Sequence, residues 1–268
     1  MTALGKAVSS ADLDWVEAGT WRIMVAEDSG FWRNVVRSGI HDFASDLTVI
    51  EAGDGQSALE ALSRDRIDIA FVDLAMPEIN GAEVIKRIQA DARMPFFAVI
   101  SVNSDAAEIA RMRKLSAYDY LVKPFGTDSI KRVLTTYERI SRQSRVLIVD
   151  DSGTARSIIR RILQRSVFNF EIVEAGDGVA AFELYADRPA DIVFLDLNMP
   201  GLDGAQITRI LRAHNRSVRI VLMSGSQEAL DRHAVLTPAA ALKKPFFPND
   251  LDRVVHRLFD LPLPYGGA

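Results

Sequence analysis

The sequence contains an internal duplication with a spacing of 123 residues. Short motifs of the first half return 123 positions later: Glu27-Asp28-Ser29-Gly30 as Asp150-Asp151-Ser152-Gly153, Glu51-Ala52-Gly53-Asp54-Gly55 as Glu174-Ala175-Gly176-Asp177-Gly178, Asp73-Leu74 as Asp196-Leu197, and Ser101 as Ser224. Lys123-Pro124-Phe125 returns as Lys244-Pro245-Phe246 at a spacing of 121, so the second copy is two residues shorter before this motif. Solenoid repeats are only about 20–50 residues long. A repeat of domain size therefore predicts two related domains.

The composition narrows the class of protein. The chain has 268 residues, of which 48% are hydrophobic and 25% charged, as in ordinary globular proteins. A net charge of −4 argues against a dedicated nucleic-acid-binding surface, which would be strongly basic. The absence of cysteine excludes disulfides, thiolate zinc sites and a cysteine nucleophile, and fits a reducing compartment.

Neither a membrane span nor a signal peptide is predicted. No stretch approaches the roughly 18–20 apolar residues that cross a bilayer. Asp12, Asp14 and Glu17 stand where a signal peptide would need an apolar run. We therefore expect a cytoplasmic protein with no membrane insertion and no direct contact with nucleic acid.

Each copy alternates strand and helix patterns. In the first copy the predicted strands are Arg22–Ala26, Leu47–Glu51, Ile67–Val72, Phe96–Ile100 and Tyr118–Val122, and the predicted helices are Phe31–His41, Gln56–Ser63, Gly81–Ala90, Ala106–Leu115 and Asp128–Arg142. The second copy repeats the alternation from Arg145 to about Phe259. Five such strand–helix units per copy predict an α/β fold, a doubly wound parallel sheet with its functional crevice at the carboxyl ends of the strands.

The duplication and its flanks set the expected domain boundaries. We expect an N-terminal extension over residues 1–20, a first domain over 21–142, a second domain over 145–260 and a C-terminal tail over 261–268. The junction between the domains is short and has no Pro or Gly, which favours a limited range of domain orientations over two independent beads. The few residues after Phe259 are expected to be too few for an output domain.

Polar residues gather where the predicted strands end. In the first copy these are Glu27, Asp28, Asp73, Ser101 and Lys123, and in the second they are Asp150, Asp151, Asp196, Ser224 and Lys244. Three carboxylates at one sheet edge repel one another unless a cation neutralises them, and an all-oxygen set suits Mg²⁺. The cation, an ammonium and a hydroxyl around one carboxylate could stabilise a transferring phosphoryl group. Any one of these acidic residues could merely cap a helix or face water, but five matched positions in both copies disfavour that interpretation.

This motif set resembles the receiver domain of two-component response regulators, over residues from about 21 to 260. The resemblance implies two tandem (βα)5 flavodoxin-like domains with a parallel sheet order of 2-1-3-4-5, and phosphorylation on Asp73 and Asp196. It also implies ligands for Mg²⁺, phosphoryl-binding lysines, switch residues and cis-prolines. The implied Mg²⁺ ligands are Glu27, Asp28, Asp73 and the backbone carbonyl of Ala75 in the first copy, and Asp150, Asp151, Asp196 and the backbone carbonyl of Asn198 in the second. The implied phosphoryl-binding lysines are Lys123 and Lys244, and the implied switch residues are Ser101, Tyr120 and Ser224. The implied cis-prolines are Pro124 and Pro245.

The two copies differ at three positions near these residues. Tyr120 matches the aromatic switch of the family, whereas its counterpart is Ala241, so the second copy is expected to transmit its signal differently. Val102, where the family usually has a small residue, is expected to crowd the acceptor Asp73, whereas Gly225 leaves access open. Ala75 cannot hydrogen-bond an attacking water and Asn198 can, so we expect slower loss of phosphate from the first copy.

The resemblance implies a two-component response regulator that accepts phosphoryl groups from a sensor histidine kinase or a histidine phosphotransfer protein. It is expected to act by changing its binding to a downstream protein target, with a second copy of the chain as a further candidate partner. Its only catalysis would be its own phosphorylation and dephosphorylation. One alternative is a truncated tandem-receiver regulator of a catalytic output domain, such as a cyclic-dinucleotide synthase. Another is a scaffold or dimerising protein in which one receiver is degenerate.

Overall fold

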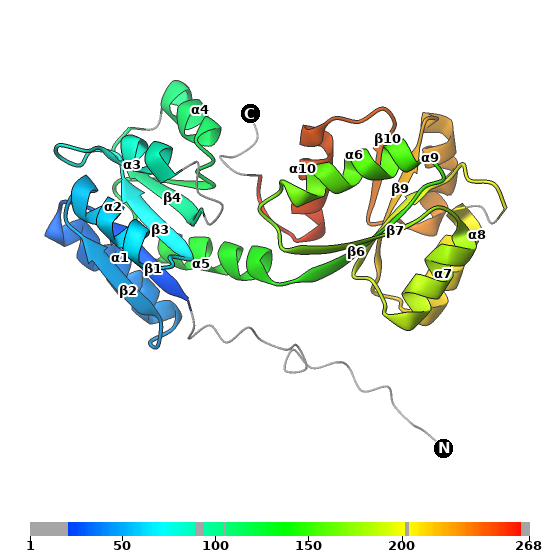
Figure 1. The fold of residues 1–268 in the computed structure, drawn as a ribbon, viewed down its shortest axis with the longest axis horizontal. Coiled ribbons are helices and arrows are strands. Elements are labelled where there is room, and N and C mark those ends of the chain that lie inside the picture. Colours follow the sequence, from blue (N-terminus) through cyan, green and yellow to red (C-terminus); the bar gives the residue numbers. More distant parts are fainter. Residues whose placement is uncertain (1–20, 89–93, 104, 202–203, 264–268) are drawn as a thin grey trace, which may run out of the picture. The chain divides into compact units, whose positions relative to one another are not determined.

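The computed structural model describes residues 21–88, 94–103, 105–201 and 204–263. The chain divides between Glu138 and Arg139, near the end of the helix Thr127–Ser141, into two compact units, called here the first unit and the second unit; this helix is described with the first unit (Figure 1). The predicted N-terminal extension and residues 264–268 of the predicted tail lie outside the described residues. Within the described ranges, no helix is both long and apolar enough to cross a membrane.

The first unit is a five-stranded parallel sheet with helices between its strands (Figure 1). Its elements are β1 (Arg22–Ala26), α1 (Gly30–Phe43), β2 (Thr48–Ala52), α2 (Gly55–Arg64), β3 (Ile69–Asp73), α3 (Gly81–Ile88), β4 (Phe96–Ser101), α4 (Ala106–Lys114), β5 (Asp119–Val122) and α5 (Thr127–Ser141). The strands lie in the order β2-β1-β3-β4-β5, which confirms the predicted topology.

The second unit repeats this architecture. Its elements are β6 (Ser144–Val149), α6 (Gly153–Gln164), β7 (Phe170–Ala175), α7 (Gly178–Asp187), β8 (Ile192–Asp196), α8 (Gly204–His214), β9 (Arg219–Ser224), α9 (Gln227–His233), a 3₁₀ turn (Ala234–Leu236), β10 (Ala240–Lys243) and α10 (Pro248–Leu258). The order β7-β6-β8-β9-β10 is the same topology. Only Arg142 and Gln143 separate α5 from β6.

The central strands form the core of each unit. All five residues of β3 and all five of β8 are buried, as expected for strands covered by helices on both faces of a parallel sheet. Phe71 and Phe194 are among the largest fully buried side chains. The continuous apolar pattern of these strands therefore fixes which element lies at the centre of each sheet.

Two helices of the first unit begin one residue earlier than the sequence pattern indicated. The helices α1 and α2 each start on a glycine, which has low helix propensity inside a helix and was left outside the predicted ranges; α6 and α7 start on a glycine as well. The first backbone N–H groups of a helix have no partner within the helix, and Asp54 and Asp177 supply a side-chain acceptor at the N-caps of α2 and α7. The hydrogen bond that a polar N-cap residue accepts thus outweighs the low helix propensity of a glycine at the first position of the helix.

Gly81 lets the start of α3 approach the strand that ends at Asp73. A Cβ atom at residue 81 would lie 2.2 Å from the carbonyl oxygen of Asp73 and 2.8 Å from a Val72 methyl carbon. We expect Gly81→Ala to lower the free energy of unfolding by about 2 kcal/mol or more, because backbone has to move. Urea denaturation measures this, with Gly126→Ala as the control because a Cβ there meets no atom within 4 Å. Equal midpoints for the two variants would contradict the prediction.

Candidate functional site

Each unit brings its predicted site residues to one edge of its sheet. In the first unit, Glu27 and Asp28 follow β1, Asp73 and Ser101 are the last residues of β3 and β4, and Lys123 follows β5. In the second unit the same positions relative to β6, β8, β9 and β10 are taken by Asp150, Asp151, Asp196, Ser224 and Lys244. Because all strands are parallel, these positions share the carboxyl end of the sheet.

Lys123 joins the two buried carboxylates of the first site. Its Nζ lies 2.7 Å from Oε2 of Glu27 and 2.8 Å from Oδ2 of Asp73. The other oxygens of these carboxylates accept backbone hydrogen bonds: Ser29 N–H donates to Glu27 at 3.2 Å, and Ala75 N–H donates to Asp73 at 3.1 Å. One oxygen of Asp73 is thus held by the backbone while the other faces the lysine.

Burial sets the charges of the first site. The pKa of Glu27 is raised to about 7, chiefly by burial and also by the nearby Asp73 charge, against the opposing effects of Lys123 and of the Ser29 hydrogen bond. Burial alone would lower the pKa of Lys123, but hydrogen bonds to Asp73 and Glu27 outweigh it and raise that pKa above its usual value. Lys123 is therefore protonated at neutral pH, while the carboxylates still lack a full counter-charge.

The second site has the same contacts. Lys244 Nζ lies 2.5 Å from Oδ2 of Asp150 and 2.9 Å from Oδ2 of Asp196. Ser152 N–H donates to Asp150 at 2.9 Å and Asn198 N–H donates to Asp196 at 3.2 Å. The pKa of Lys244 is raised as well, because the hydrogen bonds that it donates to its two carboxylate partners outweigh burial. The two units therefore share one arrangement of acceptor, lysine and backbone.

Both sites fit a hard divalent cation. Carboxylate oxygens of Glu27, Asp28 and Asp73 lie within 4.8 Å of one another, and the same holds for Asp150, Asp151 and Asp196. All the ligand atoms are oxygen, and a single lysine balances only part of the negative charge. The middle carboxylate of each set is exposed, which leaves solvent access for the water ligands that Mg²⁺ usually retains. Receiver domains bind Mg²⁺ through acidic residues of this kind, and the donor set agrees.

An arginine in each unit holds the loop that carries the acidic pair, and the sequence analysis did not identify it. Arg33 donates to the carbonyl oxygens of Glu27 at 2.6 Å and Asp28 at 3.0 Å. Arg156, at the same 123-residue spacing, donates to the carbonyl oxygen of Asp150 at 2.6 Å. The recurrence of an arginine at this position in both copies was the signal that could have revealed it.

The predicted switch residues differ in their surroundings. Tyr120, half-buried at β5, has its hydroxyl 2.8 Å from the carbonyl oxygen of Asn103 and 3.1 Å from Oε2 of Glu108. In the second unit, Asn198 Nδ2 donates to Ser224 Oγ at 3.2 Å, a contact that Ala75 cannot make with Ser101. The ring of Tyr120 therefore contacts the β4–α4 loop, and its counterpart Ala241 has no such group.

Val102 is 72% exposed, so most of the residue is in contact with solvent. Lys123 is nevertheless more enclosed than Lys244, with 9% of its side chain exposed against 24%.

Comparisons with known sequences match both units. The family model described as response regulator receiver domain matches residues 23–135 and 146–256. The protein-glutamate methylesterase/protein-glutamine glutaminase 5 of Myxococcus xanthus is 36% identical over 118 residues, which cover 44% of this chain and 33% of the relative. The response regulator MprA of Mycobacterium sp. (strain KMS) is 35% identical over 109 residues, which cover 40% of this chain and 46% of the relative. The chain thus matches less than half the length of these curated relatives.

A solved structure is similar over most of the chain. It is a crystal structure of a two-component system response regulator/GGDEF domain protein, with a TM-score of 0.63 and 23% sequence identity. The match covers 90% of this chain and 99% of that chain. At this identity the likeness shows the fold.

Proposed function

This chain belongs to the response regulator receiver domain family, and we propose that it is a two-component response regulator phosphorylated on Asp73 and Asp196. The observation that carries the proposal is that each of these carboxylates lies within 2.9 Å of a lysine Nζ and beside two further carboxylates. A lysine and a divalent cation are the groups that stabilise the charge of a transferring phosphoryl group.

The reaction forms one bond and breaks one. A carboxylate oxygen of Asp73 or Asp196 attacks the phosphorus of a phosphohistidine donor, and the bond from phosphorus to the donor nitrogen breaks. The electron pair of that bond stays on the nitrogen, so imidazole leaves and the aspartate becomes an acyl phosphate. Lys123 or Lys244 then pairs with phosphoryl oxygens, and Ser101 or Ser224 turns toward them.

Mg²⁺ would neutralise the phosphoryl oxygens when bound. Its ligands would be Glu27, Asp28 and Asp73 in the first unit, and Asp150, Asp151 and Asp196 in the second. The backbone carbonyls of Ala75 and Asn198 complete the proposed sets. Arg33 and Arg156 hold the loops that present these carboxylates.

Receiver domains are signalling modules, and we assign this chain the same role without a turnover reaction of its own. Its phosphodonor is a sensor histidine kinase or a histidine phosphotransfer protein, and its output is altered binding to a downstream protein. In the first unit Tyr120 would report the state of the site to the β4–α4 loop and α4, a role that the hydrogen bonds of its hydroxyl to Asn103 and Glu108 support.

The proposal is tested by the chemistry of the phosphorylated chain. After incubation with phosphoramidate and Mg²⁺, we expect incorporated phosphate that hydroxylamine removes, because hydroxylamine cleaves an acyl phosphate. Phosphate that resists hydroxylamine would place the modification on a hydroxyl group and contradict the assignment. No incorporation from the small donor or from a phosphohistidine protein would also contradict it.

Loss of phosphate is expected to differ between the two acceptors. The Asn198 carboxamide lies at the strand edge that carries Asp196 and can hydrogen-bond an attacking water, whereas the Ala75 methyl group beside Asp73 cannot. One such hydrogen bond is worth about tenfold in rate. We therefore expect Asn198→Ala to lengthen the half-life of phosphorylated Asp196 about tenfold.

The reciprocal variant Ala75→Asn should shorten the half-life of phosphorylated Asp73 by a similar factor. Half-lives are followed by phosphate-affinity electrophoresis in chains that retain one acceptor, with the wild-type side chains at residues 75 and 198 as the references. Equal half-lives for all four chains would contradict the role of the carboxamide.

A second candidate function is control of a catalytic output domain that makes a cyclic dinucleotide. The similar structure of a response regulator/GGDEF domain protein, matched over 90% of this chain, favours this candidate. The reading frame of the source gene beyond Ala268 decides the point. A stop codon there would remove this candidate and leave signalling through a separate protein.

A further inference from the structure

An aromatic side chain, that of Trp32, lies beside Lys123 of the first site. The Trp32 ring on α1 lies 5.0 Å from the Phe125 ring, at an interplanar angle of 35°. Lys123 Nζ lies 5.6 Å from the centroid of the same indole. Phe31 packs edge-on against Trp32 at 5.1 Å. The indole thus lies beside the lysine that contacts Asp73, and only 9% of the Lys123 side chain is exposed.

The second site has no aromatic side chain at the equivalent position. The positions of Phe31 and Trp32 are taken by Thr154 and Ala155 at the 123-residue spacing, whereas the phenylalanine is kept as Phe246. The Ala155 methyl group cannot pack against Phe246 as the Trp32 indole packs against Phe125, and 24% of the Lys244 side chain is exposed.

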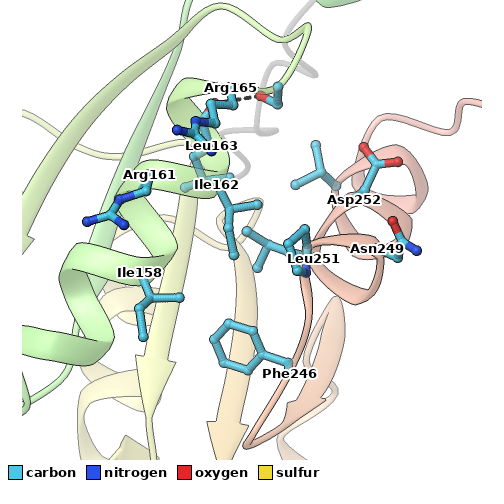
Figure 2. Close-up of a pocket in the computed structure, with 12 residues that line it drawn as sticks. Ile158, Arg161, Ile162, Leu163, Arg165, Phe246, Asn249, Leu251 and Asp252 are labelled. Atoms are coloured by element: carbon cyan, nitrogen blue, oxygen red, sulfur yellow. Dashed lines mark hydrogen bonds between the residues drawn. The ribbon is translucent and has the colours of Figure 1, made fainter. Parts of the chain in front are cut away.

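Phe246 instead borders an open groove. Figure 2 shows Phe246 at one end of this groove, with Ile158 of α6 on one side and Leu251 of α10 on the other. The groove has a volume of about 410 Å³. The open groove therefore lies against the ring of Phe246, whose counterpart in the first unit, Phe125, is in contact with Trp32.

From this contrast we propose that Trp32 is a specificity-determining residue: its indole restricts phosphodonors with bulky leaving groups at Asp73, whereas Ala155 admits them at Asp196. The inference rests on the proposed function of both aspartates. Phosphoryl oxygens must come beside Lys123 Nζ, so the leaving group of an in-line donor lies farther out, in the space that the indole covers. A donor with an imidazole leaving group has to displace the indole, whereas one with ammonia does not.

The contacts that the indole loses when it is displaced determine the expected change in phosphorylation rate. The ring pair with Phe125 and the cation contact with Lys123 are both lost when the indole moves. Interactions of these two kinds together correspond to about a tenfold change in rate.

The test compares two donors of different size in chains with one acceptor. Phosphoramidate releases ammonia and monophosphoimidazole releases imidazole; in each case the phosphorus–nitrogen bond breaks, its electron pair stays on nitrogen, and the acyl phosphate forms on aspartate. Trp32→Ala is made with Asp196→Asn, and Ala155→Trp with Asp73→Asn. The rate of phosphorylation by each donor is measured by intact-mass spectrometry.

We expect Trp32→Ala to raise the rate ratio of monophosphoimidazole to phosphoramidate about tenfold at Asp73. Ala155→Trp should lower the same ratio by a similar factor at Asp196. The ratio for Trp32→Phe should lie between the ratios of the chains with tryptophan and with alanine at residue 32. Circular dichroism and the rate with phosphoramidate confirm that each variant is folded.

Two results would overturn the inference alone, and a third would contradict the proposed function as well. An unchanged ratio, or equal changes with both donors, would mean that Trp32 acts only on stability or on the orientation of Lys123. Failure of both donors to phosphorylate either single-acceptor parent chain would instead contradict the proposed function, and the inference would fall with it.

Discussion

Lys123→Met is expected to lower the rate of Asp73 phosphorylation by about 10²- to 10³-fold, because it removes a fixed cation that stabilises transition-state charge. The effect should be confined to one unit, since Lys123 contacts Glu27 and Asp73 alone among the site carboxylates. Asp196 should keep its wild-type rate. Lys244→Met should give the reverse pattern, because its partners are Asp150 and Asp196.

Methionine is the better replacement because it keeps most of the length and packing of lysine while it removes the charge. The variant leaves two buried carboxylates without their cation, so we expect its free energy of unfolding at pH 7 to fall by about 3 kcal/mol. Rates are measured with phosphoramidate by intact mass, and urea denaturation confirms that the variant is folded. A wild-type rate at Asp73 in folded Lys123→Met would contradict the role of the lysine.

Removal of Mg²⁺ with EDTA is expected to lower phosphorylation of both aspartates by about 10²-fold or more. Three carboxylates face one lysine in each site, so without a divalent cation a phosphoryl donor meets a net negative charge. Adding Mg²⁺ back should restore both rates. Asp28→Asn and Asp151→Asn each remove one exposed carboxylate and should raise the Mg²⁺ concentration needed in their own unit alone. Equal rates with EDTA and with Mg²⁺ would contradict a role for the cation.

The fold and the polar site could be predicted because they depend on features that the sequence shows directly. The apolar runs Ile69–Val72 and Ile192–Leu195 identify the central strands, β3 and β8. Parallel strands then bring Asp73 and Asp196, at the ends of these strands, to the same edge as the other site residues. The duplication supplied a second copy of each motif, which separated Asp73 from acidic residues that only cap helices. The predicted cis peptide bonds before Pro124 and Pro245 are present.

The features that the sequence analysis missed depend on side-chain geometry. The residue pattern placed Trp32 at the start of a helix but did not show that its ring reaches Phe125 and Lys123. In the sequence, nothing distinguished Arg33 from the other charged residues, although its guanidinium donates a hydrogen bond to the backbone carbonyl of Glu27. The crowding assigned to Val102 came from its branched side chain, but most of the residue is exposed. Such contacts follow from the angle at which a helix meets the sheet, which periodicity does not give.

The central claim is that both units accept phosphoryl groups, one on Asp73 and the other on Asp196. Intact-mass spectrometry after incubation with Mg²⁺ and phosphoramidate tests it most directly, on the wild-type chain and on Asp73→Asn and Asp196→Asn. The account predicts two phosphoryl additions in the wild-type chain and one in each variant. A single addition that only one variant abolishes would contradict it and make the other unit a degenerate receiver, as in a scaffold.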